Sequence, residues 1–281
     1  MDDRYEQVRD AVLRTGTRFA ELTRAAAENP GAMATRDWTV EDTAAHVLSL
    51  VDHYVSLFDQ DADRLPVPDL PGLIAATTVN TVNRTNAVIL TNLRDRSPER
   101  LARGIEAGVG ELLAVSRGVD PERTFPWLGG SRVPAAGLLA HLLNEFLVHG
   151  WDMSRGLRRD WPMPDADAGL FVELFLVGVI RHGLGELLGT DARPSARPIS
   201  VEFRSAYTAP VLLVLEGRQV RVGHHGEPVD ARVTFRPARF NLMLFGRTGV
   251  ARALVRRDIT VGGRRPWLLP AFLRVVHLPQ N

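Results

Sequence analysis

The chain has 281 residues, of which 45% are hydrophobic, and its 34 basic and 33 acidic residues leave a net charge of +1. This balance gives no electrostatic footprint for nucleic acid or an anionic membrane, while the length and apolar fraction suit one or two globular domains with substantial cores. Cysteine is absent and every basic residue is arginine, which excludes a disulfide, a protein thiolate and a lysine Schiff base.

The N-terminal segment, MDDRYEQVRDAVLR, is polar and charged. It has no apolar signal core, and the chain contains no run of about 18 apolar residues. We therefore expect a cytoplasmic protein that does not enter a membrane. Residues 3–28 carry apolar side chains at helical spacing and predict a first helix, which stops at Asn29-Pro30-Gly31.

A second helix is predicted from Trp38 to Phe58. Thr39 and Asp42 have the Thr-x-x-acid spacing of a capping box at its start. His46 projects at the edge of the apolar side of this helix, so we expect its ring to face the interior of a helical bundle.

Residues 73–93 predict a third helix, which is rich in Asn and Thr and has a polar inner face. Arg84 lies in its middle, where it is either a solvated arginine or an anion-binding one. Residues 98–118 predict a fourth helix.

The stretch from Leu138 to Arg155, LLAHLLNEFLVHGWDMSR, is the helix around which we expect the chain to be organised. His141, Glu145 and His149 are four residues apart and share one side, and Asp152 lies on that side as well. A single histidine on an apolar face is more often a satisfied core residue than a ligand. Glu and His one turn apart, however, offer a carboxylate and an imidazole to one metal ion.

A third ligand would come from an inward-facing histidine, for which His141, His46 and His53 compete. Three protein ligands leave coordination positions open for water and substrate. This is the arrangement of a catalytic metal site, because structural zinc is normally closed by four protein ligands.

Residues 168–188 predict a last helix of the first region, and beyond the linker GTDARPSARP the periodicity changes to alternation. The predicted strands, which we expect to form an antiparallel sheet, span residues 199–203, 211–215, 220–222, 231–235 and 259–261. Helices are predicted at 237–245, 250–256 and 267–276. We place the boundary near 192–198, which gives a helical bundle at 1–194 and an α+β domain at 195–281.

Two motifs and one long segment carry a family resemblance. The motifs are W-T-V-x-D-x-A-A-H from Trp38 to His46 and H-x-x-x-E-x-x-x-H-x-x-D from His141 to Asp152. Together they resemble the mycothiol-dependent maleylpyruvate isomerase family of the DinB-like superfamily. Residues 237–263 look like the helix, Gly-Arg turn, helix and strand of that family's second domain. The resemblance implies a DinB-like metal-binding four-helix bundle followed by a sterol-carrier-like domain.

The resemblance also assigns roles to individual residues. The metal, most simply zinc, would have three ligands: His46, Glu145 and His149. His141 becomes a neighbour of this set. Asp152 would orient His149 or contact the thiol cosubstrate. Arg84 and Arg247 would hold an acidic substrate, and Arg247 would also take part in binding the cosubstrate.

The resemblance implies that mycothiol is the nucleophile, because a protein without cysteine must take its thiol from a cosubstrate. The thiol either adds reversibly to a double bond, as in an isomerase, or displaces a leaving group, as in a transferase.

Two alternative functions remain open. One is a thiol-independent metal-dependent hydrolase, lyase or cyclase, and the other is a non-catalytic ligand-binding protein. The expected partners are a small-molecule substrate and a low-molecular-weight thiol, in a monomer or weak homodimer.

Overall fold

The computed structural model describes residues 2–59, 64–188 and 193–276, which pack as two compact units. The first, which we call the bundle unit, comprises Met1–Leu73, Asn83–Phe125 and Pro134–Met163. The second, the sheet unit, comprises Ile74–Val82, Pro126–Val133 and Pro164–Asn281. A helical region is thus followed by a sheet with helices, and the predicted fold class is confirmed.

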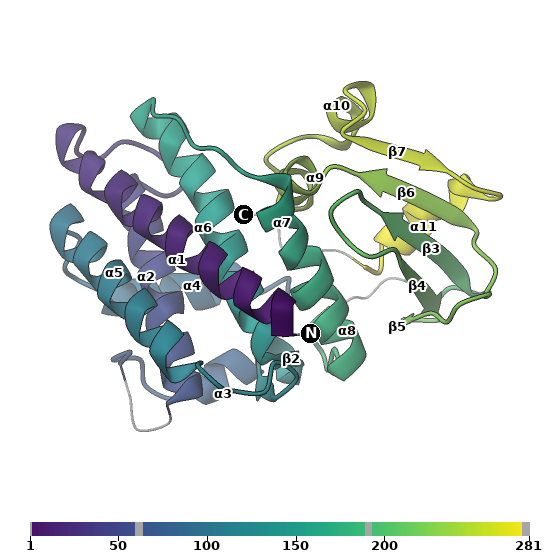
Figure 1. The fold of residues 1–281 in the computed structure, drawn as a ribbon, viewed down its shortest axis with the longest axis horizontal. Coiled ribbons are helices and arrows are strands. Elements are labelled where there is room, and N and C mark those ends of the chain that lie inside the picture. The colour runs from purple at the N-terminus through teal and green to yellow at the C-terminus, as the bar shows by residue number, and fades with distance from the viewer. Residues whose placement is uncertain (1, 60–63, 189–192, 277–281) are drawn as a thin grey trace. The chain divides into compact units, whose positions relative to one another are not determined.

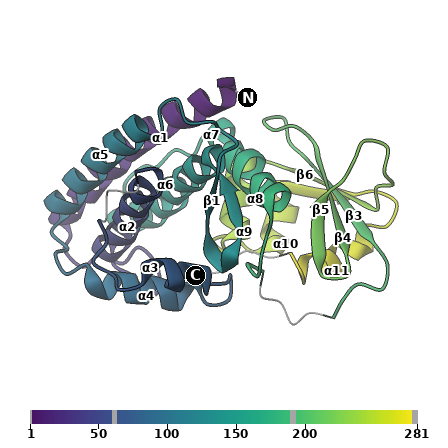
Figure 2. The same cartoon turned by 90° about the horizontal axis from the view of Figure 1, so that it is seen from below.

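Four long helices form the core of the bundle unit: α1 (Asp2–Arg24), α2 (Val40–Phe58), α5 (Pro98–Val115) and α6 (Ala135–Leu157). Each of α1 and α2 packs against both α5 and α6, and the four lie side by side in both views (Figures 1 and 2). The first helix ends in a short 3₁₀ turn, η1 (Ala25–Glu28). The four predicted helices of this core are therefore present.

The start of α2 is fixed by the predicted capping box. Thr39 accepts a hydrogen bond from the backbone N–H of Asp42, and the Asp42 carboxylate accepts one from the backbone N–H of Thr39. These two bonds satisfy backbone donors that the first turn of a helix leaves without partners. They set the start of α2, and with it the position of His46 two turns later.

The predicted third helix is wrong in its continuity. The structure has two helices there, α3 (Leu70–Ala75) and α4 (Val82–Asn92). Between them Thr81 Oγ1 accepts a hydrogen bond from the Thr78 backbone N–H, and Thr78 Oγ1 accepts one from that of Asn80. Such side-chain bonds compete with helical backbone bonds and explain why an Asn- and Thr-rich stretch breaks.

The helix predicted at 168–188 ends earlier. It is a continuous run of α7 (Asp165–Leu170), a π-helical turn η3 (Phe171–Leu176) and α8 (Val177–His182). The run stops at Gly183, whose φ of 124° is a conformation that favours glycine. These helices pack within the sheet unit. The domain limits 1–194 and 195–281 stay a prediction.

The sheet unit is built on a five-stranded sheet in the order β5-β4-β3-β6-β7. The strands are β3 (Ile199–Arg204), β4 (Val211–Glu216), β5 (Gln219–Val222), β6 (Ala231–Phe235) and β7 (Ile259–Gly262). Helices α9 (Pro237–Leu244) and α10 (Val250–Val255) connect β6 to β7, and the 3₁₀ turn η4 (Pro266–Leu268) and helix α11 (Leu269–Leu273) follow β7. A separate short pair, β1 (Thr124–Pro126) and β2 (Arg132–Pro134), flanks the turn η2 (Leu128–Gly130).

The expected antiparallel sheet needs one correction, because β3 and β6 are parallel. The chain forms β3, β4 and β5 as antiparallel neighbours and then returns to the free edge of β3. Asp230 fixes this return, since its carboxylate accepts a hydrogen bond from the Ser200 backbone N–H while its own N–H donates to Ser200 Oγ. Alternation of side chains predicts strands, but it does not predict their order.

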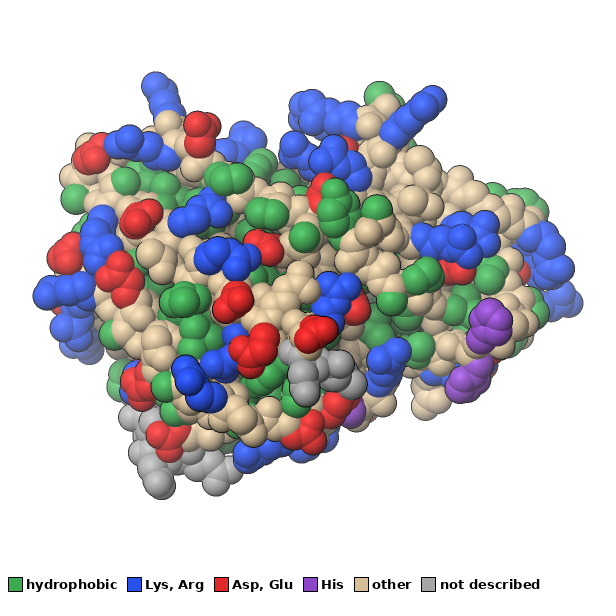
Figure 3. Space-filling model, viewed as in Figure 1, with side chains coloured by type: hydrophobic (Ala, Val, Ile, Leu, Met, Phe, Trp, Pro, Cys, Tyr) green, Lys and Arg blue, Asp and Glu red, His purple; other side chains and the backbone are tan. Residues whose placement is uncertain are grey.

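Charged side chains of both signs are interspersed over the bundle unit on the face seen in Figure 3. Over this part of the surface the distribution agrees with the balanced composition. No helix in the described ranges is both long enough and apolar enough to cross a membrane.

Candidate metal centre

Three ionisable side chains from two helices of the bundle unit meet in its interior. His46 comes from α2, and Glu145 and His149 come from α6, which packs against α2. The Oε2 atom of Glu145 lies 3.3 Å from His46 Nε2 and 3.2 Å from His149 Nε2. Ligand atoms of all three lie within 4.8 Å of one another, and all three residues are buried. The predicted ligand set is thus brought together.

The spacing of these atoms fits a small divalent ion. Ligands held at about 2.0–2.1 Å around a tetrahedral ion lie roughly 3.3–3.4 Å from one another. The two distances from Glu145 Oε2, 3.3 Å and 3.2 Å, are close to that value. Two imidazoles and one carboxylate also form a donor set of catalytic zinc sites, which keep a further position open. The residues present therefore fit a metal, and among the described residues they are the one such cluster.

Asp152 contacts the outer side of His149. Its Oδ2 lies 3.2 Å from His149 Nδ1, and its side chain is buried. A carboxylate in this place accepts the Nδ1–H bond and leaves Nε2 of a neutral ring with the lone pair that a metal requires. The contact holds the ring in one orientation. A role of Asp152 toward a thiol stays a prediction.

The electrostatics of the cluster favour positive charge at its centre. Burial opposes the charge on Glu145, but hydrogen bonds with His149 and His46 outweigh it and hold the pKa of Glu145 well below its usual range. Burial also opposes protonation of His149, yet hydrogen bonds with Asp152 and Glu145 raise the pKa of His149 to about 9. The two carboxylates thus stabilise positive charge on the His149 ring, whereas burial lowers the pKa of His46.

The structure separates the histidines that compete for the third ligand position. His46 is in the cluster, whereas His141 Nε2 lies 3.6 Å from the other carboxylate oxygen of Glu145, and its Nδ1 lies 3.0 Å from the Tyr54 hydroxyl. His53 is outside the cluster. Its Nε2 has no hydrogen-bond partner among the residues described, and burial lowers the pKa of His53 to about 4. His141 is a neighbour, as the resemblance implied.

Trp38 lies beside the cluster, although its place in the sequence indicated only the start of a helix and of the first family motif. Its ring centroid lies 5.0 Å from that of His46 and 6.1 Å from that of His149. It therefore packs beside both imidazoles and limits the orientations open to them. The signal was its place directly before the Thr39 cap, which puts it at the same end of α2 as His46.

The two predicted arginines belong to different units of the chain. Arg84 is exposed on α4 of the bundle unit, and no described residue forms an ion pair with it. Arg247 belongs to the sheet unit, where it is partly buried after α9 and donates a hydrogen bond of 2.7 Å to the carbonyl of Phe245. The roles of Arg84 and Arg247 toward substrate stay predictions.

The fold and the cluster define a class of protein: a helical bundle with a candidate metal centre of two histidines and one glutamate, joined to a sheet unit. Residues 6–154 match the family model of the mycothiol maleylpyruvate isomerase N-terminal domain. The match spans more than half of the chain and contains the whole cluster. The chain belongs to this family.

The crystal structure of the mycothiol-dependent maleylpyruvate isomerase is similar to this chain with a TM-score of 0.48 and 14% sequence identity, over 93% of this chain and 92% of that chain. No curated protein matches the sequence.

Proposed function

We propose that this protein is a mycothiol-dependent enzyme whose bundle unit binds one divalent ion, most simply zinc, through His46, Glu145 and His149. The observation that carries the proposal is the buried convergence of these side chains inside the segment that matches the family model. Three protein ligands leave a position open, as catalytic sites require. When bound, the ion would lower the pKa of a thiol and supply the sulfur as thiolate near neutral pH.

The chain's own residues prepare this site. Asp152 holds His149 through Nδ1, so that Nε2 faces Glu145. Trp38 packs beside the rings of His46 and His149. Since the surrounding side chains are buried, the donor atoms are held in place before any ligand arrives, which reduces the cost of ordering them on binding.

A thiol nucleophile must come from outside, because the chain has no cysteine. In an isomerase reaction the thiolate sulfur forms a bond to one carbon of an activated double bond, and the electron pair of that double bond moves toward the conjugated carbonyl. Rotation about the resulting single bond follows, and expulsion of the thiolate restores the double bond in the other geometry. In a transferase reaction the sulfur displaces a leaving group and stays on the product.

An acidic substrate would need cations, and we propose Arg84 and Arg247 for that role. Arg84 suits it because its guanidinium is exposed and forms no ion pair with the described residues. Arginine binds a carboxylate through two parallel hydrogen bonds, which orients the substrate as well as attracting it. A cytoplasmic location and a monomeric or weakly dimeric state belong to the same proposal.

Calorimetry tests the thiol step. A thiol that binds as thiolate releases a proton, so the heat of mycothiol binding to the zinc-loaded protein should depend on the ionisation enthalpy of the buffer. The matched variants are His46→Ala, which removes a proposed ligand, and His53→Ala, which removes a histidine from the same helix outside the cluster. Only His46→Ala should abolish the binding. Metal loading without any thiol binding would favour the thiol-independent enzyme instead.

A further inference from the structure

The two oxygens of the Glu145 carboxylate face different partners. Oε2 lies 3.3 Å from His46 Nε2 and 3.2 Å from His149 Nε2, whereas Oε1 lies 3.6 Å from His141 Nε2. His141 is one turn before Glu145 on α6, and His149 is one turn after it. The carboxylate therefore presents one oxygen to the cluster and the other to His141.

His141 is itself held by a residue of α2. The hydroxyl of Tyr54 lies 3.0 Å from His141 Nδ1, and the two ring centroids are 6.1 Å apart. Both side chains are buried, Tyr54 completely. Because Tyr54 follows His46 by about two turns on the same helix, α2 contributes both a candidate ligand and a contact to the neighbour of another ligand.

The contacts of His141 assign its ring proton. The distance of 3.6 Å to Glu145 Oε1 is longer than a hydrogen bond, so the contact is electrostatic. A lone pair on Nε2 would face a negative oxygen and be repelled, and Nε2 therefore carries the N–H. A neutral ring then has its lone pair on Nδ1, which accepts a hydrogen bond from the Tyr54 hydroxyl.

Such a partner is needed because a glutamate does not fix its own oxygens. The last torsion of a glutamate side chain is broad, so the backbone of α6 does not decide which oxygen faces the cluster. A donor on the outer side decides it, since ligating carboxylates are in turn held by hydrogen-bonding groups around them. In the buried interior this attraction is stronger than it would be in water.

We propose that Tyr54 and His141 are positioning residues of the metal centre. Tyr54 holds the ring of His141, and the Nε2–H of His141 holds Oε1 of Glu145 away from the cluster. Glu145 then offers one oxygen to the ion instead of two, which keeps a coordination position open for a cosubstrate. This inference rests on the proposed metal centre and gives roles to two side chains that would not touch the ion.

Metal affinity, measured by competition with a chelator, tests these roles. His141→Leu should weaken zinc binding about 10–100-fold, the usual cost of losing an outer partner. His141→Gln keeps an N–H donor near the place of Nε2 and should recover most of this loss. Tyr54→Phe should cost less than about tenfold, because Tyr54 acts through His141. The control is Tyr5→Phe, which removes another buried hydroxyl, bonded at 2.9 Å to the carbonyl of Ser116.

Two further measurements separate positioning from a loss of stability. If Tyr54 acts through His141, adding Tyr54→Phe to His141→Leu should not weaken metal binding further. Tetrahedral Co²⁺ absorbs visible light more strongly than Co²⁺ with more ligands. Release of the second oxygen in His141→Leu should therefore weaken the visible absorption of the cobalt-loaded protein, while Tyr5→Phe should leave it unchanged.

The outcomes distinguish this inference from the function on which it rests. A wild type that binds no metal would overturn both. A metal-binding wild type would overturn this inference alone if folded His141→Leu kept the wild-type affinity and cobalt spectrum, or if Tyr54→Phe had the same effect with and without His141. Circular dichroism verifies folding. Should His141→Leu not fold, equal affinities in Tyr54→Phe and Tyr5→Phe would overturn the inference.

Discussion

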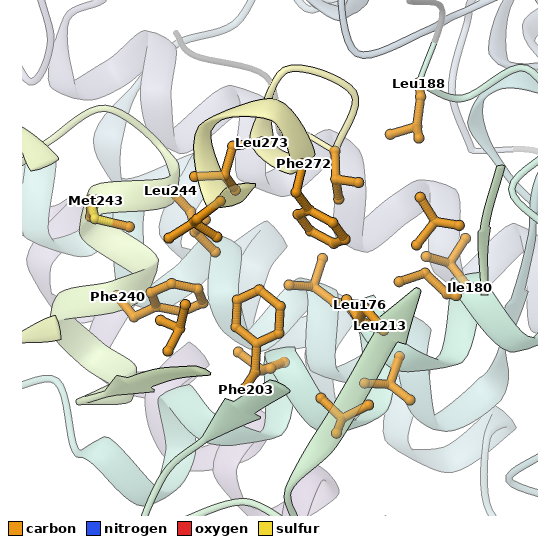
Figure 4. Close-up of a pocket in the computed structure, with 18 of the residues that line it drawn as sticks. Leu176, Ile180, Leu188, Phe203, Leu213, Phe240, Met243, Leu244, Phe272 and Leu273 are labelled. Atoms are coloured by element: carbon orange, nitrogen blue, oxygen red, sulfur yellow. The ribbon is translucent and has the colours of Figure 1, made fainter. Parts of the chain in front are cut away.

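The bundle unit brings ionisable side chains from two helices together in a closely packed core, whereas the sheet unit surrounds a cavity of about 540 Å³ with apolar side chains. In the first, a few polar atoms lie at fixed distances from one another. In the second, apolar side chains leave a space between them (Figure 4). The two units thus differ in what they offer a ligand, charged and polar donor atoms in one and apolar volume in the other, and different substitutions should disturb each.

The largest effect is expected at the ligands themselves. His149→Ala removes one of three donors and should reduce metal affinity more than about 100-fold, beyond the loss typical for an outer-shell partner. Metal analysis of the purified protein should then fall from about one ion per chain to a trace. His53→Ala, which lies outside the cluster, should keep its metal. Full occupancy in a triple variant of His46, Glu145 and His149 would show that the metal binds elsewhere.

A smaller loss is expected when the orienting carboxylate is changed. Asp152→Asn keeps the shape of the side chain but weakens its hold on His149 Nδ1, and the expected cost is about 10–100-fold in metal affinity. Competition with a chelator of known affinity measures this change. Asp160→Asn, at an exposed position after α6, is the control. Equal affinity in the two variants would mean that Asp152 has no orienting role.

Two glycines of α5 test how closely the core of the bundle unit is packed. A Cβ at Gly108 would come within 2.6 Å of Val51 Cγ1 on α2, whereas one at Gly110 meets nothing within 4 Å. Gly108→Ala should therefore lower the free energy of unfolding by about 1–3 kcal/mol, while Gly110→Ala should raise it by roughly 0.5–1 kcal/mol through helix propensity. Chemical denaturation measures both. If Gly108→Ala were as stable as Gly110→Ala, the interface between α2 and α5 would be looser than described.

The smallest effect is a pH dependence away from the metal centre. Burial raises the pKa of Asp52 to about 6. The guanidinium of Arg64, whose Nη1 lies 3.8 Å from Asp52 Oδ1, opposes this shift. The Asp52 carboxyl therefore binds its proton more tightly in the folded state than in the unfolded state. Protonation of Asp52 stabilises the fold near pH 4, and this stabilisation is lost as the pH rises through about 6.

Asp52→Asn keeps a neutral side chain at every pH. Its stability relative to the wild type should therefore improve from about pH 4 to about pH 7, as denaturant unfolding at the two pH values would show. Asp10→Asn, exposed on α1, is the control. A constant difference between Asp52→Asn and the wild type would contradict the raised pKa.

Helical spacing was sufficient to predict most of the cluster that forms the candidate metal centre. Glu145 and His149 are one turn apart on one helix, so their proximity follows from helix geometry alone. His46 and His53, in contrast, are about two turns apart on α2 and share a side of that helix. Which of them reaches Glu145 depends on how α2 packs along α6, and that is a tertiary property. The family resemblance, rather than the spacing, selected His46.

The sheet unit was less predictable. Alternating residues located the five strands of the main sheet but not the short pair β1 and β2. The parallel pairing of β3 with β6 depends on where the chain returns after β5. The cavity left no separate signal, because Phe203, Val233 and Phe272 have the apolar character of ordinary core residues. A cavity is the small difference between the volume that the backbone encloses and the volume that the side chains fill, and the sequence does not give that difference.

Cobalt substitution tests the central claim most directly. The protein, loaded with Co²⁺ in place of zinc, should develop an intense sulfur-to-metal charge-transfer band when mycothiol is added, because sulfur ligation replaces an oxygen or nitrogen donor at the open position. The same addition to cobalt-treated His149→Ala should give no such band. A wild-type spectrum that stays unchanged at saturating mycothiol would contradict the proposal that this site holds a metal-bound thiolate.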